Sequence, residues 1–176
     1  GDEPRTVKAA QIITEQGIAK IILLADEEQL KAKYQGVDFS GMQIVNPATA
    51  DIEEFANELY ELRKAKGMTL EQARVEMRKN LNYGAMMTRK GLADGMVAGA
   101  INSTGNVLKS GLTIVKTKPG TKTVSSVFLM SFEGTPYKDK DIMVFGDCAV
   151  NIDPTAEQLA DIAISSTATA KALAGI

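Results

Sequence analysis

The side chains best suited to chemistry lie in one stretch that carries positive charge and no carboxylate. Between Asp94 and Glu133 the sequence has no acidic residue, and its charged side chains there are four lysines: Lys109, Lys116, Lys118 and Lys122. A surface region with one sign of charge attracts ligands of the opposite sign and raises their local concentration. The stretch therefore predicts a site for a polyanionic ligand.

A polar turn within this stretch adds hydrogen-bond donors. Asn102, Ser103 and Thr104 precede Gly105, between an apolar run and a helical pattern. Where a turn leads into a helix, the first backbone N–H groups lack intrahelical partners and the helix dipole favours negative charge, so such turns bind phosphate. The pattern matches neither the P-loop nor the dinucleotide fingerprint. Composition alone favours the alternative, an ordinary helix N-cap beside solvated lysines.

Two residue types are scarce, which excludes several kinds of site. The sequence has no histidine and one cysteine, Cys148, so it can form neither an internal disulfide nor the usual zinc sites. We expect no metal site, and proton transfer within these residues would have to use Asp, Glu, Lys or Tyr. Cys148 follows an apolar run and has no basic neighbour, which predicts a structural role. The adjacent Asp147 could hold charge near a cleft.

The overall composition is that of a globular protein. Hydrophobic residues make up 44% and charged residues 24% of the 176 residues, and the net charge is −2. Nucleic-acid binders usually carry a basic face, so the acidic balance argues against that class. The apolar runs are far shorter than the roughly 20 residues that span a membrane, and residues 1–5 do not resemble the start of a signal peptide. We therefore expect a cytoplasmic protein with no membrane partner.

Helical and strand patterns alternate along the chain. Helices are predicted at residues 3–16, 26–34, 51–66, from 69, 80–90, 107–115 and from 153, and strands at 20–25, 42–45, 94–100, 124–131 and 142–145. This alternation predicts an α/β fold with a mainly parallel sheet covered by helices on both faces. The last two strands are close enough in sequence to pair antiparallel. A cluster of Lys, Thr, Pro and Gly at 116–122 predicts the break between two lobes.

Caps and apolar faces support these helices. We expect N-caps at Asp2, Asp26 and Asp153, and a capping box that begins at Thr69. In the helix at 51–66, the apolar residues that recur at helical spacing and predict its buried face are Ile52, Phe55, Leu59 and Leu62. In the last helix, the residues expected to be buried are Leu159, Ile162 and Leu173.

Several long motifs match those of a known family. Residues 83–120 read YGAMMTRKGLADGMVAGAINSTGNVLKSGLTIVKTKPG, and further matches are GDEPRTVKAA at 1–10, ELRKAKGMT at 61–69 and FGDCAVNIDPTAEQLADIAI at 145–164. In the same order along nearly the whole chain, these motifs resemble those of the phosphate acetyltransferases, also called phosphotransacetylases. The resemblance implies a two-lobed α/β protein with the isocitrate/isopropylmalate dehydrogenase-like fold, an active-site cleft between the lobes and, usually, a homodimer.

On this resemblance, residues 1–120 form the first lobe and residues 121–176 begin the second, and both are incomplete. Family members are longer at the C-terminal end, so the C-terminal part of the fold is expected to be missing here. The family's catalytic Asp, and the Ser and Arg that hold acetyl phosphate, belong to that part. The resemblance therefore implies no catalytic residue within this chain, and the 176 residues alone are expected to be inactive.

The reaction that the resemblance implies is an acyl transfer of acetate metabolism. A phosphate acetyltransferase reversibly moves an acetyl group between acetyl phosphate and coenzyme A by direct attack of the CoA thiolate. Such a transferase uses CoA as a substrate and needs no metal and no other cofactor. The implied partners are coenzyme A, acetyl phosphate and inorganic phosphate, with no nucleic acid.

Part of the substrate site carries over from the family. Arg63 matches a family arginine near CoA, and Ser103 and Thr104 match the loop that faces the acyl phosphate, with Asn102 in the same turn. Lys109 stands where the family more often has an arginine, so it keeps the positive charge but lacks the planar fork that suits phosphate. Without the resemblance, Arg63 reads as an ordinary surface residue near a helix end.

Two alternatives stay open at this point. The first is a phosphate butyryltransferase-like acyltransferase, because part of the acyl pocket lies outside the sequence. The second is a non-catalytic acetyl-CoA-sensing domain of the kind fused to some malic enzymes. Such a domain departs from the NSTG and KTKPG motifs, which this chain keeps.

Overall fold

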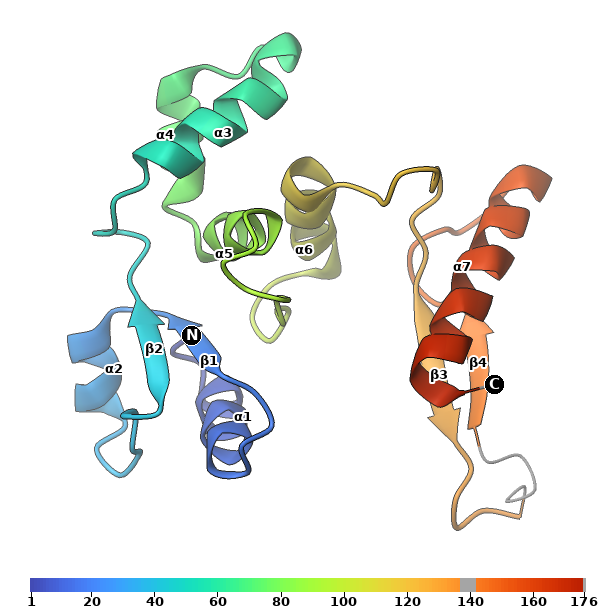
Figure 1. Cartoon of the computed structure of the whole chain (residues 1–176), viewed down its shortest axis with the longest axis horizontal. Coiled ribbons are helices and arrows are strands. Elements are labelled where there is room, and N and C mark those ends of the chain that lie inside the picture. Colours follow the sequence, from blue (N-terminus) through green and yellow to red (C-terminus); the bar gives the residue numbers. More distant parts are fainter. Residues whose placement is uncertain (137–141, 176) are drawn as a thin grey trace. The chain divides into compact units, whose positions relative to one another are not determined.

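The computed structural model describes residues 1–136 and 142–175 (Figure 1). Helices and strands alternate as far as Arg63, a run of consecutive helices follows up to Val115, and two consecutive strands precede the last helix. The chain divides into two compact units, Gly1–Lys116 and Thr117–Ile176. The first unit contains α1 (Pro4–Glu15), β1 (Ile21–Leu24), α2 (Glu27–Lys33), β2 (Met42–Val45), α3 (Glu53–Arg63), α4 (Leu70–Met77), α5 (Asn80–Arg89) and α6 (Thr104–Ser110). The second contains β3 (Val127–Ser131), β4 (Ile142–Gly146) and α7 (Ala156–Ala174).

β1 and β2 form a parallel pair with helices packed on both faces. Successive side chains of a strand point to opposite faces. Leu23 and Ala25 accordingly pack with side chains of α1 and α2. Ile22 and Leu24 pack against the core that α3, α4 and α5 share. The prediction of parallel strands between two helical layers is confirmed for this pair.

The expected mainly parallel sheet is limited to β1 and β2 among the described residues. β3 and β4 pair antiparallel in a separate ladder, as their short connection allowed. The strand predicted at 94–100 is wrong, because that segment pairs with no strand in the described part of the chain. Its Val97 is fully exposed, and Gly99 has a φ of 122°, which is strained for any other residue. A run of small apolar residues is not enough for a strand where no partner ladder exists.

The irregular segment that follows α5 is anchored by one side chain. Met96 lies over Gly84 of α5, and a Cβ atom at Gly84 would come within 2.7 Å of the Met96 Sδ atom. Because glycine leaves this space open, Met96 can pack against the core of the first unit. This contact fixes the start of the chain segment that leads to the polar turn.

The larger core of the first unit lies among three helices. Its buried residues are Ile52, which precedes α3, Phe55, Ala56 and Leu59 of α3, Ala73 and Met77 of α4, Tyr83, Ala85, Met86 and Met87 of α5, and Ile114. The predicted buried face of α3 is confirmed, with Leu62 at its edge. The rings of Phe55 and Tyr83 are tilted, with centroids 5.0 Å apart, a geometry that adds to the stabilisation from burial.

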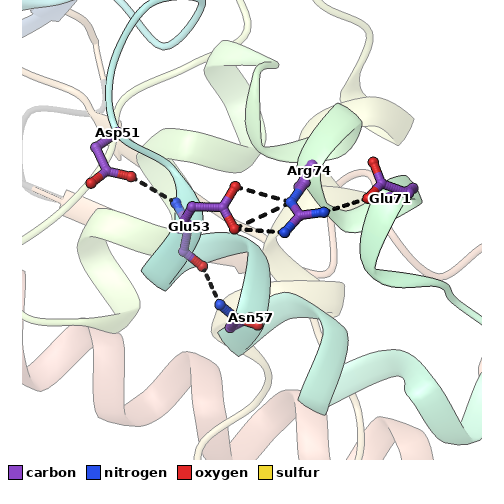
Figure 2. A network of polar contacts seen from close by, with 5 residues as sticks. All are labelled: Asp51, Glu53, Asn57, Glu71 and Arg74. Carbon is purple, nitrogen blue, oxygen red and sulfur yellow. Dashed lines mark hydrogen bonds and ion pairs between the residues drawn. The ribbon is translucent and has the colours of Figure 1, made fainter.

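An exposed ion-pair network joins α3 to α4 (Figure 2). Arg74 donates to both carboxylate oxygens of Glu53 through Nε and Nη2, the latter at 2.8 Å, and pairs with Glu71 through Nη1. Asp51 accepts from the Glu53 N–H, and Asn57 donates to the Glu53 carbonyl at 2.8 Å. Exposed pairs contribute little stability, but the bidentate geometry fixes how α3 lies on α4.

The N-terminal cap of α1 differs from the prediction. Glu3, not Asp2, caps this helix, and its Oε2 accepts from the Thr6 N–H at 2.9 Å. The Asp2 carbonyl instead accepts from Tyr34 Oη at 2.8 Å and from Lys33 Nζ at 3.1 Å. These long-range contacts hold Asp2 against the C-terminal end of α2, and Glu3 therefore takes the N-cap position of α1.

Three further caps were predicted, and two of them are confirmed. Asp26 caps α2, and Thr69 forms the capping box of α4. The cap predicted at Asp153 is wrong, because Thr155 caps α7 through a reciprocal box with Gln158. That box satisfies both the N-cap and the N3 backbone N–H groups, which a single aspartate two residues earlier cannot do.

The second unit is an antiparallel hairpin with one helix against β4. Ile162 and Ala170 of α7 are buried, but Leu159 and Leu173 are 53% and 67% exposed, so their predicted burial is wrong. Residues four apart share a helix face, and the face that meets the hairpin runs through Ile162, Ser166 and Ala170. Leu159 precedes this buried face and Leu173 follows it along the helix. Among the described helices, none is both long and apolar enough to cross a membrane.

Candidate functional site

The polar turn leads into α6 and faces solvent. Ser103 is the N-cap of α6, and its Oγ atom accepts from the Asn106 N–H at 3.3 Å. Ser103 and Thr104 are exposed, and Asn102 is half-buried. The N-cap interpretation of Ser103 is therefore correct. Its hydroxyl hydrogen still remains available to a ligand, because capping uses only the oxygen as an acceptor.

Backbone donors gather at the same turn. Thr104 and Gly105 are the first residues of α6, so their N–H groups belong to the turn that has no intrahelical acceptors. Lys109 is exposed and lies four residues after Gly105, on the same helix face. Since Gly105 has no side chain, nothing from that residue separates the ammonium group from the turn. The structure thus brings the four residues predicted in this region together on one turn and one short helix.

α6 is held in place by α5. Ser110 is buried, and its Oγ atom donates to the Leu81 carbonyl at 3.1 Å. α6 continues into the π-helical segment Gly111–Val115, whose Ile114 is only 1% exposed within the core. These contacts fix the rear of α6, so its first turn is presented to solvent on a rigid support.

Arg5 is a neighbour of the turn that the sequence analysis missed. Its Nη2 atom donates to the Ala100 carbonyl at 3.0 Å, while Nε pairs with Glu3 at 2.6 Å. The contact places the Arg5 guanidinium beside Ala100, which precedes Asn102 by two residues. The sequence contained one signal for this residue. Arg5 lies in the first turn of a helix, where the helix dipole disfavours a cation, so its presence there suggests a contact outside the helix.

Arg63 ends α3 and is half-buried. Within residues 1–136 and 142–175, its guanidinium makes no hydrogen bond or ion pair, so all its donors are open to a ligand. No hydrogen bond or ion pair in the described part of the chain joins Arg63 to the turn at Asn102. Its place in the substrate site therefore stays a prediction.

In the second unit, Asp147 is the centre of a hydrogen-bond network. Its Oδ1 atom accepts from the backbone N–H groups of Ser126, Ala149 and Val150 at 3.1, 3.1 and 3.3 Å, and also from the Ser126 hydroxyl. Its Oδ2 atom accepts from the N–H of Asn151 at 2.7 Å and from the same residue's side-chain amide. The carboxylate thus ties the loop after β4 to the segment before β3.

These contacts determine the charge state of Asp147. Partial burial raises its pKa, but hydrogen bonds from Ser126, Ala149 and Asn151 outweigh burial and hold the pKa well below the ordinary value of 3.8. A carboxylate with so low a pKa is a poor proton acceptor at neutral pH. Asp147 is therefore suited to holding a loop and not to general-base catalysis.

Cys148 is half-buried and engaged with the backbone. Its Sγ atom donates to the Phe145 carbonyl at 2.9 Å, and its N–H donates to the Ser126 hydroxyl oxygen at 3.1 Å. Both contacts agree with the structural role that the sequence predicts for this thiol.

A polar hollow of about 350 Å³ lies at the carboxyl ends of β1 and β2. Its walls are formed by Asp2, Leu24, Ala25, Asp26, Gln29, Lys33, Asn46 and Asn80. A second hollow of about 570 Å³ lies beside α2 and β2. None of the predicted substrate-binding residues lines either hollow. In residues 1–136 and 142–175, no three Asp, Glu or Cys side chains gather closely enough to hold a metal ion.

Comparison with known proteins connects this geometry to one family. The sequence profile described as "Phosphate acetyl/butaryl transferase" matches residues 1–176. The chain is 43% identical over 177 residues to the phosphate acetyltransferase of Thermoanaerobacterium thermosaccharolyticum, covering 100% of this chain and 54% of that protein. It is 45% identical over 172 residues to that of Acetivibrio thermocellus, covering 97% and 52%.

A solved structure agrees with this match. The structure of a phosphotransacetylase from Streptococcus pyogenes superposes with a TM-score of 0.88 at 39% identity, over 97% of this chain and 51% of that one. The chain therefore spans about half the length of the curated relatives that it matches. By its sequence over all 176 residues and by its fold, the chain belongs to the phosphate acetyl/butaryl transferase family.

Proposed function

We propose that the complete protein is a phosphate acetyltransferase, which reversibly transfers an acetyl group between acetyl phosphate and coenzyme A. The observation that carries the proposal is the match of the whole chain to relatives named phosphate acetyltransferase. The turn at Asn102 supports it, since hydroxyls, first-turn N–H groups and Lys109 lie together in a stretch without acidic residues.

The proposed chemistry is a direct transfer between two bound substrates. A carboxylate removes the CoA thiol proton, the thiolate attacks the carbonyl carbon of acetyl phosphate, and the bond from that carbon to the phosphate oxygen breaks to release inorganic phosphate. In this scheme Ser103, Thr104 and Asn102 face the acyl phosphate, and Lys109 stabilises its negative charge. Arg63 binds a phosphate group of CoA. No metal or further cofactor takes part.

The larger architecture is part of the same proposal. The units Gly1–Lys116 and Thr117–Ile176 would belong to two lobes of the isocitrate/isopropylmalate dehydrogenase-like fold, with the boundary near residue 120. We further propose a cytoplasmic homodimer without nucleic-acid or membrane partners. The acidic composition supports the absence of nucleic acid.

The kinetics of one variant test both the function and the CoA contact. Thioester formation from acetyl phosphate and CoA is followed by its ultraviolet absorbance in the complete protein. Arg63→Ala is expected to raise the KM for CoA about tenfold or more, because a charge-assisted hydrogen bond is worth roughly 1.5–3 kcal/mol. The KM for acetyl phosphate should change much less.

The matched control is Lys66→Ala, which removes one positive charge from the same helix end and should leave both KM values unchanged. Absence of thioester in the wild-type protein rejects the function. An unchanged KM for CoA in Arg63→Ala rejects only the role of Arg63. Butyryl phosphate, assayed in parallel, should give a lower kcat/KM than acetyl phosphate.

A further inference from the structure

The segment that carries Lys116 leaves α6 in an unusual conformation. Gly111–Val115 is π-helical, and the Lys116 N–H closes it by donating to the Gly111 carbonyl at 2.9 Å. Lys116 itself has a φ of 69°. Residues other than glycine rarely adopt this left-handed region, and they persist there only where surrounding contacts hold them.

Arg89, the last residue of α5, makes such a contact. Its Nη1 atom donates to the Ile114 carbonyl at 3.1 Å, and its Nε atom donates to Glu58 of α3 at 3.0 Å. The side chains of Arg89 and Glu58 are 28% and 34% exposed, so both are largely covered by protein. Because the guanidinium is a rigid planar fork, the pair with Glu58 also aims Nη1 at the carbonyl.

The position of the Ile114 carbonyl explains why this contact matters. It lies in the last turn of the helical segment, where carbonyls lack intrahelical donors and a cation is favoured. The Ile114 side chain is buried, so the residue is held from both its side chain and its backbone. Only Val115 separates it from Lys116. The contact that holds the Ile114 carbonyl therefore also sets the direction in which the chain continues to Lys116.

The residues that follow are suited to attract an anion. Lys116 and Lys118 are exposed, and in the described part of the chain neither forms an ion pair. The nearest acidic residues in sequence are Asp94 and Glu133. Among the described residues, no carboxylate therefore neutralises the positive charges of Lys116 and Lys118. The charge of Arg89, in contrast, is paired with Glu58.

Resting on the proposed function, we infer that Arg89 is a positioning residue for the phosphate-bearing substrates. By holding the Ile114 carbonyl it fixes the turn at Lys116, and so holds the Lys116 ammonium group in place for the anion. Arg89 itself touches no substrate.

Steady-state kinetics of the complete protein test this role. Arg89→Met should raise the KM of one substrate, acetyl phosphate or CoA, about three- to tenfold while kcat changes less than about twofold. Lys116→Met should raise the same KM. Because Arg89 acts through Lys116, the double variant should be no worse than the more affected single variant. Arg89→Lys, which can reach only one of the two partners, should give an intermediate KM.

The matched control is Lys90→Met, which removes the cation next to Arg89 in sequence. Lys90 Nζ pairs with Glu54 of α3 at 2.6 Å and does not hold the Ile114 carbonyl, so this variant should keep the KM values within about twofold of wild type. Melting temperatures establish that each variant is folded. If Arg89→Met is too unstable to assay, Arg89→Lys decides the question alone.

Limited proteolysis with trypsin provides a readout that does not depend on activity. Trypsin can cut after Lys116, whereas Pro119 protects the bond after Lys118. Cleavage after Lys116 should be at least about threefold faster in Arg89→Met than in wild type or Lys90→Met, because the open turn must be populated for cleavage.

The outcomes separate the two claims. If wild-type protein forms no thioester, the proposed function fails and the inference fails with it. If wild-type protein is active but Arg89→Met changes neither KM, or affects a different KM from Lys116→Met, only the inference is overturned. Faster cleavage with unchanged KM values would mean that Arg89 is purely structural, and unchanged cleavage would mean that it does not hold the turn.

Discussion

Residues 1–176 produced alone should show transferase turnover roughly 10²- to 10⁴-fold below that of the complete protein, the loss typical of a missing general base. The chain has no histidine. Asp147, the carboxylate with the most extensive hydrogen bonding in the described part of the chain, has a pKa held well below 3.8. On the family resemblance, we expect the proposed base in the half of the relatives' length that this chain does not span.

The comparison requires that the shorter protein be folded. Near-ultraviolet circular dichroism establishes its folded state, and calorimetric titration with inorganic phosphate then measures binding. Residues 1–176 should retain weak phosphate affinity, and Lys109→Gln should reduce it, since the turn at Asn102 is complete within the first unit. Turnover by residues 1–176 within tenfold of the complete protein would place the base inside this chain and overturn the proposed location of the catalytic centre.

Asp147→Asn should destabilise the second unit by about 2–3 kcal/mol, roughly 30- to 150-fold in its unfolding equilibrium. In the variant, the amide oxygen can replace Oδ1 and accept from Ser126, Ala149 and Val150. The NH₂ group then replaces Oδ2, which in wild type accepts from the backbone and side-chain N–H groups of Asn151. Donors facing donors leave half-buried polar groups without an acceptor, which costs more than losing a hydrogen bond in water. Urea unfolding, with hydrogen–deuterium exchange of peptides from residues 142–151, measures the loss.

The pH dependence of the same variant follows from the lowered pKa of Asp147. A carboxylate whose pKa is lower in the folded state stabilises the fold above its ordinary pKa and loses that contribution as the pH falls. The difference between wild type and Asp147→Asn should stay constant from about pH 5 to about pH 8 and shrink below about pH 3.8. Asp153→Asn is the control, because this exposed aspartate takes no part in the network. Equal stability of wild type and Asp147→Asn at neutral pH would refute the assigned role.

Local signals in the sequence predicted most of the elements that position the site. The apolar face of α3, the capping box at Thr69 and the limits of β2 depend on neighbouring residues, which a sequence displays directly. The strand predicted at 94–100 failed for the opposite reason. Strand formation depends on a partner ladder, and no local pattern reports whether a partner is present.

Only part of the candidate site was predicted, because a sequence shows local patterns and not long-range contacts. Ser103 and Thr104 form a local turn, and the sequence places them correctly at a helix start. The contacts of Arg5 with Ala100 and of Arg89 with Ile114 span 95 and 25 residues. Such contacts depend on tertiary packing, so composition and spacing could not reveal them. The inward-turned carboxylate of Asp147 is likewise evident only from its partners.

Exchange of labelled inorganic phosphate into acetyl phosphate tests the central claim most directly. Direct transfer requires both substrates on the protein, so the complete protein should incorporate label when CoA is present and should incorporate none when CoA is omitted. Label that appears without CoA would reveal a covalent acetyl-protein intermediate and contradict direct attack by the thiolate. No exchange in the presence of CoA would contradict the proposed activity itself.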